Sequence, residues 1–523
     1  MSTNLKIARA YSILVAASIA GHALSMVKEM IGASYFGVSK AMDSFYAALT
    51  VPNLINNIFL SLFAIIFIPI LAKYRTKDMA EANRIVSTIS NLIFIALFVI
   101  SLAIFAFAGR VIALSSPGLD AGTAAAAEKM LRVVSAAMIF TGAVNMLSGV
   151  INAFEHFLWP AVSGMFVTLC TIFLLLFFTG RLGVFVLGWG LLAGTILQFL
   201  FLAPLAERYG LRHSAVIDLE HPEIRRTLNL MFVFLVIPLL GGLGTAVNRF
   251  MASWLPGGSI SALAYADKLV QVPLLIFSAA IATSIYPFLS AQAAENRTEE
   301  IRETVSLSIR MSGFIFIPIA VTMMILARPA IRLLFQRGAF DAAATALTSR
   351  ILVFYCLILF SNYAATIMMR LLFAFQDLKS IILVVAATLA ANIVLNFVFI
   401  KVIYPPACGI ALATAASSLI GAVLYFIILK RRISNLHGLT ILRALLKITA
   451  FSLVSGLAVF GTQKALGGLL SDTLAAQAAV LAASSLAGVL VFVSISAFFG
   501  LEEFRKVYKL AMTRFRTNPG MPA

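Results

Sequence analysis

The sequence predicts an all-α polytopic membrane protein with about 14 transmembrane helices. The 523 residues have a mean hydropathy of +1.02, and only 11% of them are charged. Apolar stretches long enough to cross a hydrocarbon core, about 20 residues each, recur from residue 8 to residue 500. This composition excludes a soluble enzyme, and the net charge of +18 lies mainly in short loops, so we expect no binding of nucleic acid.

Breaks at charged, Gly or Pro clusters delimit the expected spans. In chain order they are 8–33, 42–73, 84–108, 124–153, 158–180, 183–206, 226–254, 260–292, 304–328, 343–374, 378–402, 406–430, 441–465 and 474–499. Lys and Arg concentrate in the connections 73–84, 206–226, 294–303 and 430–432, which an even number of spans separates. The bias of Lys and Arg toward the inside therefore predicts that both termini are cytoplasmic. The connection after the ninth span, with Arg328, Arg332 and Arg337, is an exception.

The chain matches itself when it is shifted by about 220 residues. The matched pairs are Pro69-Ile-Leu-Ala with Pro287-Phe-Leu-Ser, Gly118-Leu-Asp120 with Gly338-Ala-Phe-Asp341, Ala153-Phe154-Glu155 with Ala374-Phe375-Gln376, and Gly188 and Gly194 with Gly409 and Ala415. We expect an N-terminal six-helix repeat at 1–217, a C-terminal six-helix repeat at 222–437, and an extra helix pair with a basic cytoplasmic tail at 438–523. Two parallel repeats around a central cavity are typical of transporters.

Ionisable side chains inside a membrane cost roughly 2.5–3.5 kcal/mol each and usually face water or one another. Here they gather in the first, second, seventh and eighth spans, as His22, Lys28, Asp43, Arg249, Asp267 and Lys268. Facing cations would form an electropositive pocket for a phosphate or pyrophosphate group. Simpler interpretations stay open: Lys28 and Asp43 at helix ends near the membrane surface, Asp267 in a structural ion pair, Arg249 as an interfacial anchor and His22 as a packing residue.

The stretch 37–59, GVSKAMDSFYAALTVPNLINNIF, brings Pro52, Asn53, Asn56 and Asn57 into the second span. Spacings of three and four residues place the asparagines on one helix face, which we expect to line the cavity. Pro52 should bend the helix. The motifs HExxH and GxSxG and paired Cys ligands are missing from the sequence. We therefore expect a transporter without a cofactor, driven by the membrane potential or a monovalent cation.

Several motifs are similar to those of the MurJ/MviN family, in the multidrug/oligosaccharidyl-lipid/polysaccharide exporter superfamily. They are Phe36-Gly37, Met42-Asp43-Ser-Phe45-Tyr46, Val51-Pro52-Asn53-Leu54, Phe67-Ile-Pro69, Ala264-Tyr265-Ala266-Asp267-Lys268-Leu269, Pro287-x-Leu289-Ser290 and Leu334-Phe335-Gln336-Arg337-Gly338. The resemblance implies a flippase for cell wall biosynthesis in the bacterial cytoplasmic (inner) membrane. Such a flippase moves lipid II, the undecaprenyl-pyrophosphate-linked peptidoglycan precursor, from the inner to the outer leaflet by alternating access. The resemblance also implies basic residues at the pyrophosphate and sugar, a groove for the polyprenyl tail in the last two helices, and cell-wall synthesis proteins as partners.

The chain departs from the family pattern at several of these positions. Lys28 and Lys268 stand where the family usually has arginine, and Asp43 matches the family aspartate. His22 replaces another expected arginine, and Asn56 and Asn57 replace a basic pair. A sodium site of some relatives would correspond to Asn248, Asn392 and Asn396, a weak set of ligands without a carboxylate.

The reduced number of arginines leaves other functions open. One is a flippase for another lipid-linked oligosaccharide or exopolysaccharide. Another is a drug or cation exporter of the same superfamily, which would depend on a membrane-embedded carboxylate. The last is a structural partner in an envelope-synthesis complex that transports nothing.

Overall fold

The computed structural model describes most of the chain as helices. The described residues are 3–59, 79–154, 156–209, 212–284, 289–292, 295, 297–434, 436–469 and 473–508, with the backbone alone for 3–16, 226–234 and 278–284. By their contacts the residues form two compact units. The first unit comprises residues 1–261 and 337–341, and the second comprises 262–336 and 342–523. This division by contacts does not test the two sequence repeats, whose expected boundary near 217–222 stays a prediction.

Twelve helices in the described part of the chain are long and apolar enough to cross a membrane. They coincide with the twelve expected spans from 84–108 to 474–499, which confirms the all-helical polytopic class. The expected spans 8–33 and 42–73 include residues for which the structure describes no side chains or no placement. The repeat motif at Pro69 and most of its partner at Pro287 also lie outside the described residues.

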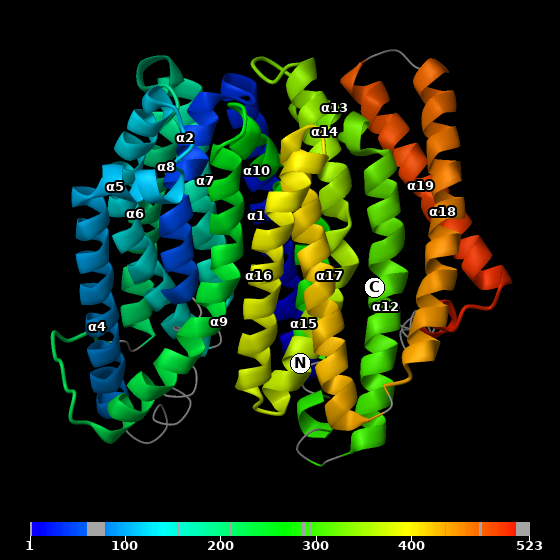
Figure 1. The fold of residues 1–523 in the computed structure, drawn as a ribbon. Helices are drawn as coiled ribbons and strands as arrows, with labels where there is room; N and C mark the ends of the chain where they lie inside the picture. The colour runs from blue at the N-terminus through cyan, green and yellow to red at the C-terminus, as the bar shows by residue number, and fades with distance from the viewer. Residues whose placement is uncertain are drawn as a thin grey trace, which may run out of the picture. The chain divides into compact units, whose positions relative to one another are not determined.

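The first unit contains eight of the described helices. They are α1 (Thr3–Phe36), α2 (Lys40–Ala48), α4 (Met79–Ala106), α5 (Ala108–Ser115), α6 (Ala121–Ala153), α7 (Leu158–Leu182), α8 (Phe185–Arg208) and α9 (Pro222–Ser253), coloured from blue to green in Figure 1. Residues 50–59 are also helical and follow α2 after a turn at Leu49. α8 packs on α7 and α6, and α7 packs on α1. A Cβ on Gly194 of α8 would lie 2.4 Å from Val167 Cα of α7, so this close contact between helices requires glycine.

The second unit contains the remaining described helices. They are α10 (Ser259–Ser284, which begins in the first unit), α12 (Thr298–Ile325), α13 (Ala327–Phe335), α14 (Ala342–Cys356), α15 (Ile358–Ala374), α16 (Leu378–Val402), α17 (Pro406–Ile433), α18 (Gly438–Leu469) and α19 (Leu474–Phe498). α16 packs on α17, and α18 packs on both α19 and α12. A Cβ on Gly488 of α19 would lie 2.4 Å from Val459 of α18. Small residues thus bring the C-terminal helix pair close together.

The connection expected after the ninth span is instead the short helix α13. Ile331 and Phe335, four residues apart on this helix, are fully buried, whereas Arg328 and Arg332 are exposed. The helix is therefore amphipathic. Part of the arginine cluster that breaks the charge pattern belongs to this helix and not to a loop.

The segment 337–341 follows α13 in the chain but belongs to the first unit. Ala339 N–H donates to the Ser34 carbonyl of α1 at 2.8 Å. Gly37 and Gly338 both have a left-handed backbone, with φ of +58° and +56°. A Cβ on Gly338 would lie 2.2 Å from the Ser34 oxygen. Glycine is required here because the two backbones touch and the backbone is left-handed.

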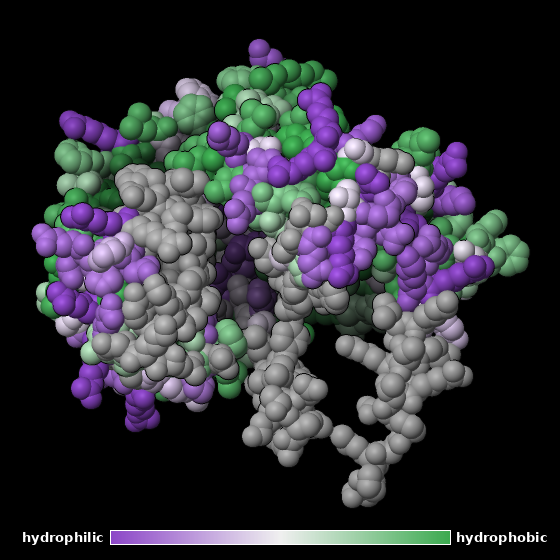
Figure 2. Space-filling model, turned by 90° about the horizontal axis from the view of Figure 1, so that it is seen from below, coloured by the Kyte–Doolittle hydropathy of each residue, from purple (hydrophilic) through white to green (hydrophobic). Residues whose placement is uncertain are grey.

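Two of the basic connections share one side of the first unit. Arg84, at the start of α4, pairs with Asp218 of the segment between α8 and α9 at 3.1 Å. The expected connections 73–84 and 206–226 therefore meet at the same end. Figure 2 views the molecule from below, the end at which α4 begins in Figure 1, and hydrophilic residues gather on this face.

The other two basic connections share one side of the second unit. Arg302, at the start of α12, donates to the carbonyl of Ile433 at the end of α17, at 3.0 Å from Nε and 2.7 Å from Nη2. The two connections of each pair thus lie on the same side of their unit, as expected for segments that an even number of spans separates. The orientation of the chain in the membrane stays a prediction.

Candidate substrate-binding site

A polar network joins α1 and α2 in the first unit. Lys28 Nζ lies 3.0 Å from Glu29 Oε1, and Tyr46 Oη donates to Glu29 Oε2 at 3.2 Å. The Glu29 side chain is only 7% exposed and that of Lys28 is 22% exposed. A buried carboxylate requires such partners because its desolvation is costly. An ammonium and a phenol hydroxyl here serve its two oxygens.

Arg249 of α9 extends this network. Its Nη1 donates to the Tyr46 carbonyl at 3.0 Å and lies 3.3 Å from Thr50 Oγ1. The α2 turn at Leu49 is where this carbonyl becomes accessible to a side chain. Lys28, Glu29, Tyr46, Thr50 and Arg249 are called the cationic network below. Its ionisable groups, two cations and one carboxylate, sum to one positive charge, which attracts anions.

Asp43 lies in the first turn of α2, where its carboxylate is 3% exposed. The Gly258 N–H donates to Asp43 Oδ2 at 2.5 Å, and the Ser261 N–H donates to Oδ1 at 2.7 Å. Both oxygens thus bind main-chain groups where the turn after α9 leads into α10: Gly258 in the turn and Ser261 in the first turn of the helix. Asp43 therefore fastens this turn to α2, and its expected contact with substrate stays a prediction.

The other ionisable candidates lie elsewhere. His22 of α1 is exposed, and its Nδ1 lies 2.7 Å from the Ser18 carbonyl. Asp267 and Lys268 lie on the part of α10 that belongs to the second unit. Asp267 is exposed and accepts a hydrogen bond from Gln271 Nε2 at 3.3 Å, and Lys268 is half-buried. The structure therefore brings Lys28 and Arg249 into one network.

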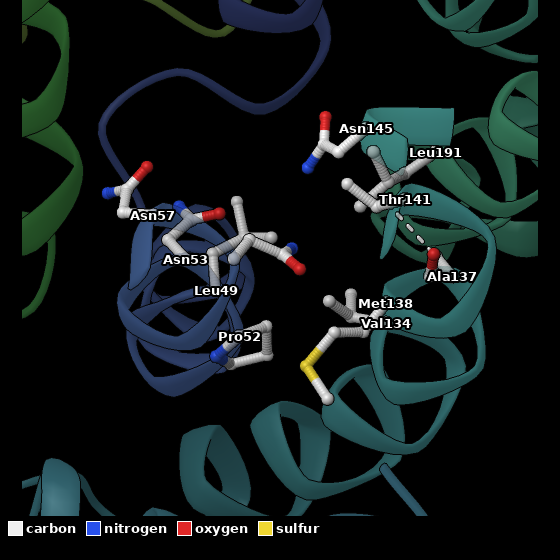
Figure 3. Close-up of a pocket in the computed structure, with 11 residues that line it drawn as sticks. Leu49, Pro52, Asn53, Asn57, Val134, Ala137, Met138, Thr141, Asn145 and Leu191 are labelled. Atoms are coloured by element: carbon white, nitrogen blue, oxygen red, sulfur yellow. Dashed lines mark hydrogen bonds between the residues drawn. The ribbon is translucent and has the colours of Figure 1, made fainter. Parts of the chain in front are cut away.

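A pocket of about 230 Å³ lies in the first unit between residues 50–59, α6 and α8 (Figure 3). It is lined by Leu49, Pro52, Asn53, Asn56, Asn57, Val134, Ala137, Met138, Thr141, Asn145 and Leu191. We call it the asparagine pocket. The three asparagines that the sequence placed on one helix face thus share one pocket, and their expected contact with substrate stays a prediction.

Sequence reasoning missed two polar residues of this pocket, Thr141 and Asn145 of α6. Their spacing of four residues places them on the same helix face, which was the available signal. It also missed Tyr46 and Thr50 of the cationic network. These two residues are likewise four apart. Tyr46 lies about one turn after Asp43, and Thr50 lies about one turn before Asn53.

Two of the residues expected to bind sodium form an amide cluster in the second unit. Asn392 and Asn396 of α16 are 4% and 0% exposed. Asn396 Nδ2 donates to Asn392 Oδ1 at 3.1 Å, and Asn392 Nδ2 lies 3.5 Å from Ser417 Oγ of α17. The Asn392 oxygen, a potential cation ligand, is thus used within the protein. Asn248, the third residue, lies on α9 of the first unit.

Within the described residues, no group of three or more His, Cys, Asp or Glu side chains could hold a metal ion. The three candidate ligands Asn248, Asn392 and Asn396 offer only neutral side-chain oxygens, which bind a hard cation weakly. The sodium site stays a prediction.

Comparisons with known proteins give a consistent family. A family model for the lipid II flippase MurJ matches residues 32–477. The lipid II flippase MurJ of Burkholderia cenocepacia is 26% identical over 417 residues, which cover 78% of this chain and 80% of the relative. A probable lipid II flippase MurJ of Rhizobium tropici is 27% identical over 507 residues, which cover 92% of this chain and 91% of the relative.

Solved structures share the fold. A lipid II flippase MurJ in an inward closed conformation matches with a TM-score of 0.78 and 22% identity, over 95% of this chain and 99% of that one. An inward-facing multidrug resistance MATE family transporter of the MOP superfamily matches with a TM-score of 0.66 and 15% identity, over 81% and 99%. The family model extends from the end of α1 into α19. The chain therefore belongs to the lipid II flippase MurJ family, a family of membrane transporters and not of enzymes.

Proposed function

We propose that this chain moves lipid II from the inner to the outer leaflet by alternating access, for cell wall biosynthesis. The family match over residues 32–477 supports this function. The structural observation that carries it is the cationic network, in which Lys28 and Arg249 are linked through Glu29 and Tyr46 in the first unit. A pyrophosphate is the part of lipid II that such a network attracts.

The cations lower the cost of carrying a charged head group across the membrane. A pyrophosphate cannot enter hydrocarbon alone because the desolvation of its charges is too costly. Lys28 offers a compact ammonium with three donors, and Arg249 a planar guanidinium. We propose Lys268 of α10 as a further cation. Each lysine or arginine that binds the pyrophosphate replaces part of the hydration that the anion loses.

The membrane potential favours this direction of transport. Moving one elementary charge through the potential changes the free energy by roughly 2.3 kcal/mol per 100 mV. An anionic head group that leaves a negatively charged cytoplasm gains this energy for each charge that it carries outward. No soluble nucleotide-binding motif is needed for such a mechanism.

The same proposal includes location and orientation. We place the chain in the bacterial cytoplasmic membrane with both termini in the cytoplasm, because Lys and Arg concentrate in the even-to-odd connections. Lipid II with its polyprenyl tail, the surrounding membrane lipids and cell-wall synthesis proteins are the proposed partners.

A second cargo class has one observation in its favour. Asn56 and Asn57 line a pocket whose described lining residues include no ionisable side chain, at positions where the family resemblance implies a basic pair. A flippase for another lipid-linked oligosaccharide or exopolysaccharide would fit this neutral surface. A drug or cation exporter fits less well, because the buried carboxylates Glu29 and Asp43 already bind protein groups.

The direct test is to deplete a bacterial host of its own lipid II flippase and to express this chain. We expect growth to be restored by the wild type and to be lost with Lys28→Ala or Lys268→Ala. Arg249→Ala should have a smaller effect, because its guanidinium is already used by the Tyr46 carbonyl. Failure of the wild type to restore growth, with normal amounts in the membrane, would exclude lipid II as the cargo.

A further inference from the structure

We propose that the asparagine pocket is a saccharide subsite, which binds one uncharged sugar ring of the cargo while the cationic network binds the pyrophosphate. This inference rests on the proposed function and specifies which part of the cargo this pocket recognises.

The lining of the pocket suits a sugar and not a phosphate. None of the eleven described residues that line it is ionisable. Its polar groups are one hydroxyl and four side-chain amides, each of which offers both donors and an acceptor. Sugar hydroxyls and acetamido groups need that combination. Apolar residues such as Pro52, Val134 and Met138 form the rest of the wall, against which the C–H face of a ring can pack.

One polar atom of the pocket still needs a hydrogen-bond donor. Asn56 Oδ1 is buried and accepts no hydrogen bond from any described residue. Buried polar atoms nearly always have a partner, from the protein, water or a ligand. Thr141 Oγ1 donates to the Ala137 carbonyl at 2.9 Å, the dashed line in Figure 3, and its lone pairs can therefore accept from a ligand. Asn53 and Asn145 lie on opposite sides of the same pocket in Figure 3.

The position of the pocket matches the covalent structure of the cargo. Thr50, which binds Arg249, precedes Asn53 by three residues and Asn57 by seven, so the three share one helix face. With a rise of about 1.5 Å per residue, Asn57 lies roughly 10 Å along the helix from Thr50. In a polyprenyl-pyrophosphate glycan the first sugar is bonded directly to the pyrophosphate. A sugar subsite one or two helix turns from the cations is where that ring would lie.

The size of the pocket limits what it can hold. Its volume of about 230 Å³ is below the roughly 300–1,000 Å³ of sites for drug-sized ligands. The pocket therefore accommodates a single ring and not a disaccharide with its peptide.

The test compares two ligands on the purified full-length chain in lipid nanodiscs. One is undecaprenyl pyrophosphate, which has no sugar, and the other is lipid II. We expect Asn56→Leu and Asn145→Leu each to weaken lipid II binding by about tenfold, the value of one to two lost hydrogen bonds. Binding of undecaprenyl pyrophosphate should stay within about twofold of wild type, which also shows that the variants fold. The matched control is Asn152→Leu, on the same helix but outside the lining, which should bind both ligands as wild type does.

The outcomes separate this inference from the proposed function. Wild-type affinity for lipid II in both Leu variants would overturn the saccharide subsite and leave the flippase function intact. Equal weakening for both ligands would also overturn it, because the asparagines would then act on the pyrophosphate or the tail. A wild-type chain that binds neither ligand would overturn the proposed function and this inference together.

Discussion

Each unit brings basic side chains and carboxylates together among its helices, and the two cases differ in their charge balance. In the first unit, the cationic network combines Lys28 and Arg249 with one carboxylate. In the second, Arg310 of α12 binds two carboxylates that follow α19. Its Nη1 lies 2.7 Å from both Glu502 Oε2 and Glu503 Oε1.

The second cluster, Arg310 with Glu502 and Glu503, is called the C-terminal anchor. Lys506 Nζ also lies 2.9 Å from Glu502 Oε1, so the two cations and two carboxylates of this cluster balance, and its arginine is 8% exposed. Ile448, Phe492 and Leu501 form an apolar cluster in the same unit, against which Phe314, four residues after Arg310, packs. The anchor therefore fastens the C-terminal helix pair, whereas the named ionisable groups of the cationic network sum to one positive charge.

The largest effect on stability should come from the anchor. Arg310→Met leaves Glu503, which is 1% exposed, without its cation, and breaking a buried pair in this way costs about 3–5 kcal/mol. We expect a clear fall in the melting temperature of the purified chain, with unchanged lipid II affinity of the protein that remains folded. The control is Glu502→Gln, since Glu502 is 53% exposed and an exposed pair contributes at most about 1 kcal/mol. Equal melting temperatures for Arg310→Met and the wild type would refute the anchor.

Removing charges from the cationic network should instead weaken ligand binding and leave stability almost unchanged. The double variant Lys28→Met/Glu29→Gln removes both charges, so no buried charge is left alone, and we expect little change in melting temperature. Binding of undecaprenyl pyrophosphate should weaken by about tenfold to a hundredfold, because a charge-assisted hydrogen bond contributes about 1.5–3 kcal/mol. Lys40→Met is the control, since Lys40 pairs with Asp120 at 3.2 Å and is 64% exposed. A stable double variant with wild-type affinity would exclude Lys28 from the binding site.

Glu29→Gln alone should have a smaller effect on the affinity for undecaprenyl pyrophosphate, and in the opposite direction. The variant keeps the hydrogen bond from Tyr46 and raises the charge of the network by one. Affinity for undecaprenyl pyrophosphate should therefore increase severalfold, and this gain should shrink at high salt because exposed parts of the site are screened. Weaker binding would instead mean that Glu29 holds Lys28 in position.

The smallest effect is a pH dependence of the anchor. Hydrogen bonds from Arg310 and then Lys506 lower the pKa of Glu502 from its ordinary value of 4.5 to about 2. A carboxyl group with a lowered pKa in the folded state stabilises the fold above the unfolded pKa, and this contribution is lost as the pH falls. The melting temperature of the wild type should thus fall more than that of Glu502→Gln between pH 4.5 and 2. Parallel curves for the two proteins would show that this pair adds no stability.

The sequence was sufficient for the helices that cross the membrane. Spans of about 20 apolar residues carry a strong signal, and all twelve that the structure can test were correctly placed. The short helices α5 and α13 were not predicted. Each has fewer than ten residues, and its apolar face repeats only once or twice, which a span search does not detect.

The candidate site was only partly predictable. Asn53, Asn56 and Asn57 lie on one helix, so their spacing was enough to place them on one face. Asp43 instead meets Gly258 and Ser261, more than 200 residues away in the chain. No local pattern encodes such a contact. The same is true of Arg249, whose partners on α2 follow from the packing of α9 and not from its own surroundings in sequence.

The position of segment 337–341 determines when the first unit can be completed during synthesis of the chain. Residues 1–261 lack the backbone that meets Ser34 in the first unit, since Ala339 supplies it. A ribosome that adds about 5–20 residues per second needs roughly 4–16 s to advance from residue 261 to residue 341. During that interval the first unit lacks one of its own pieces. A fragment that ends at residue 261 is therefore an unfinished unit, and synthesis of α10, α12 and α13 must come before its completion.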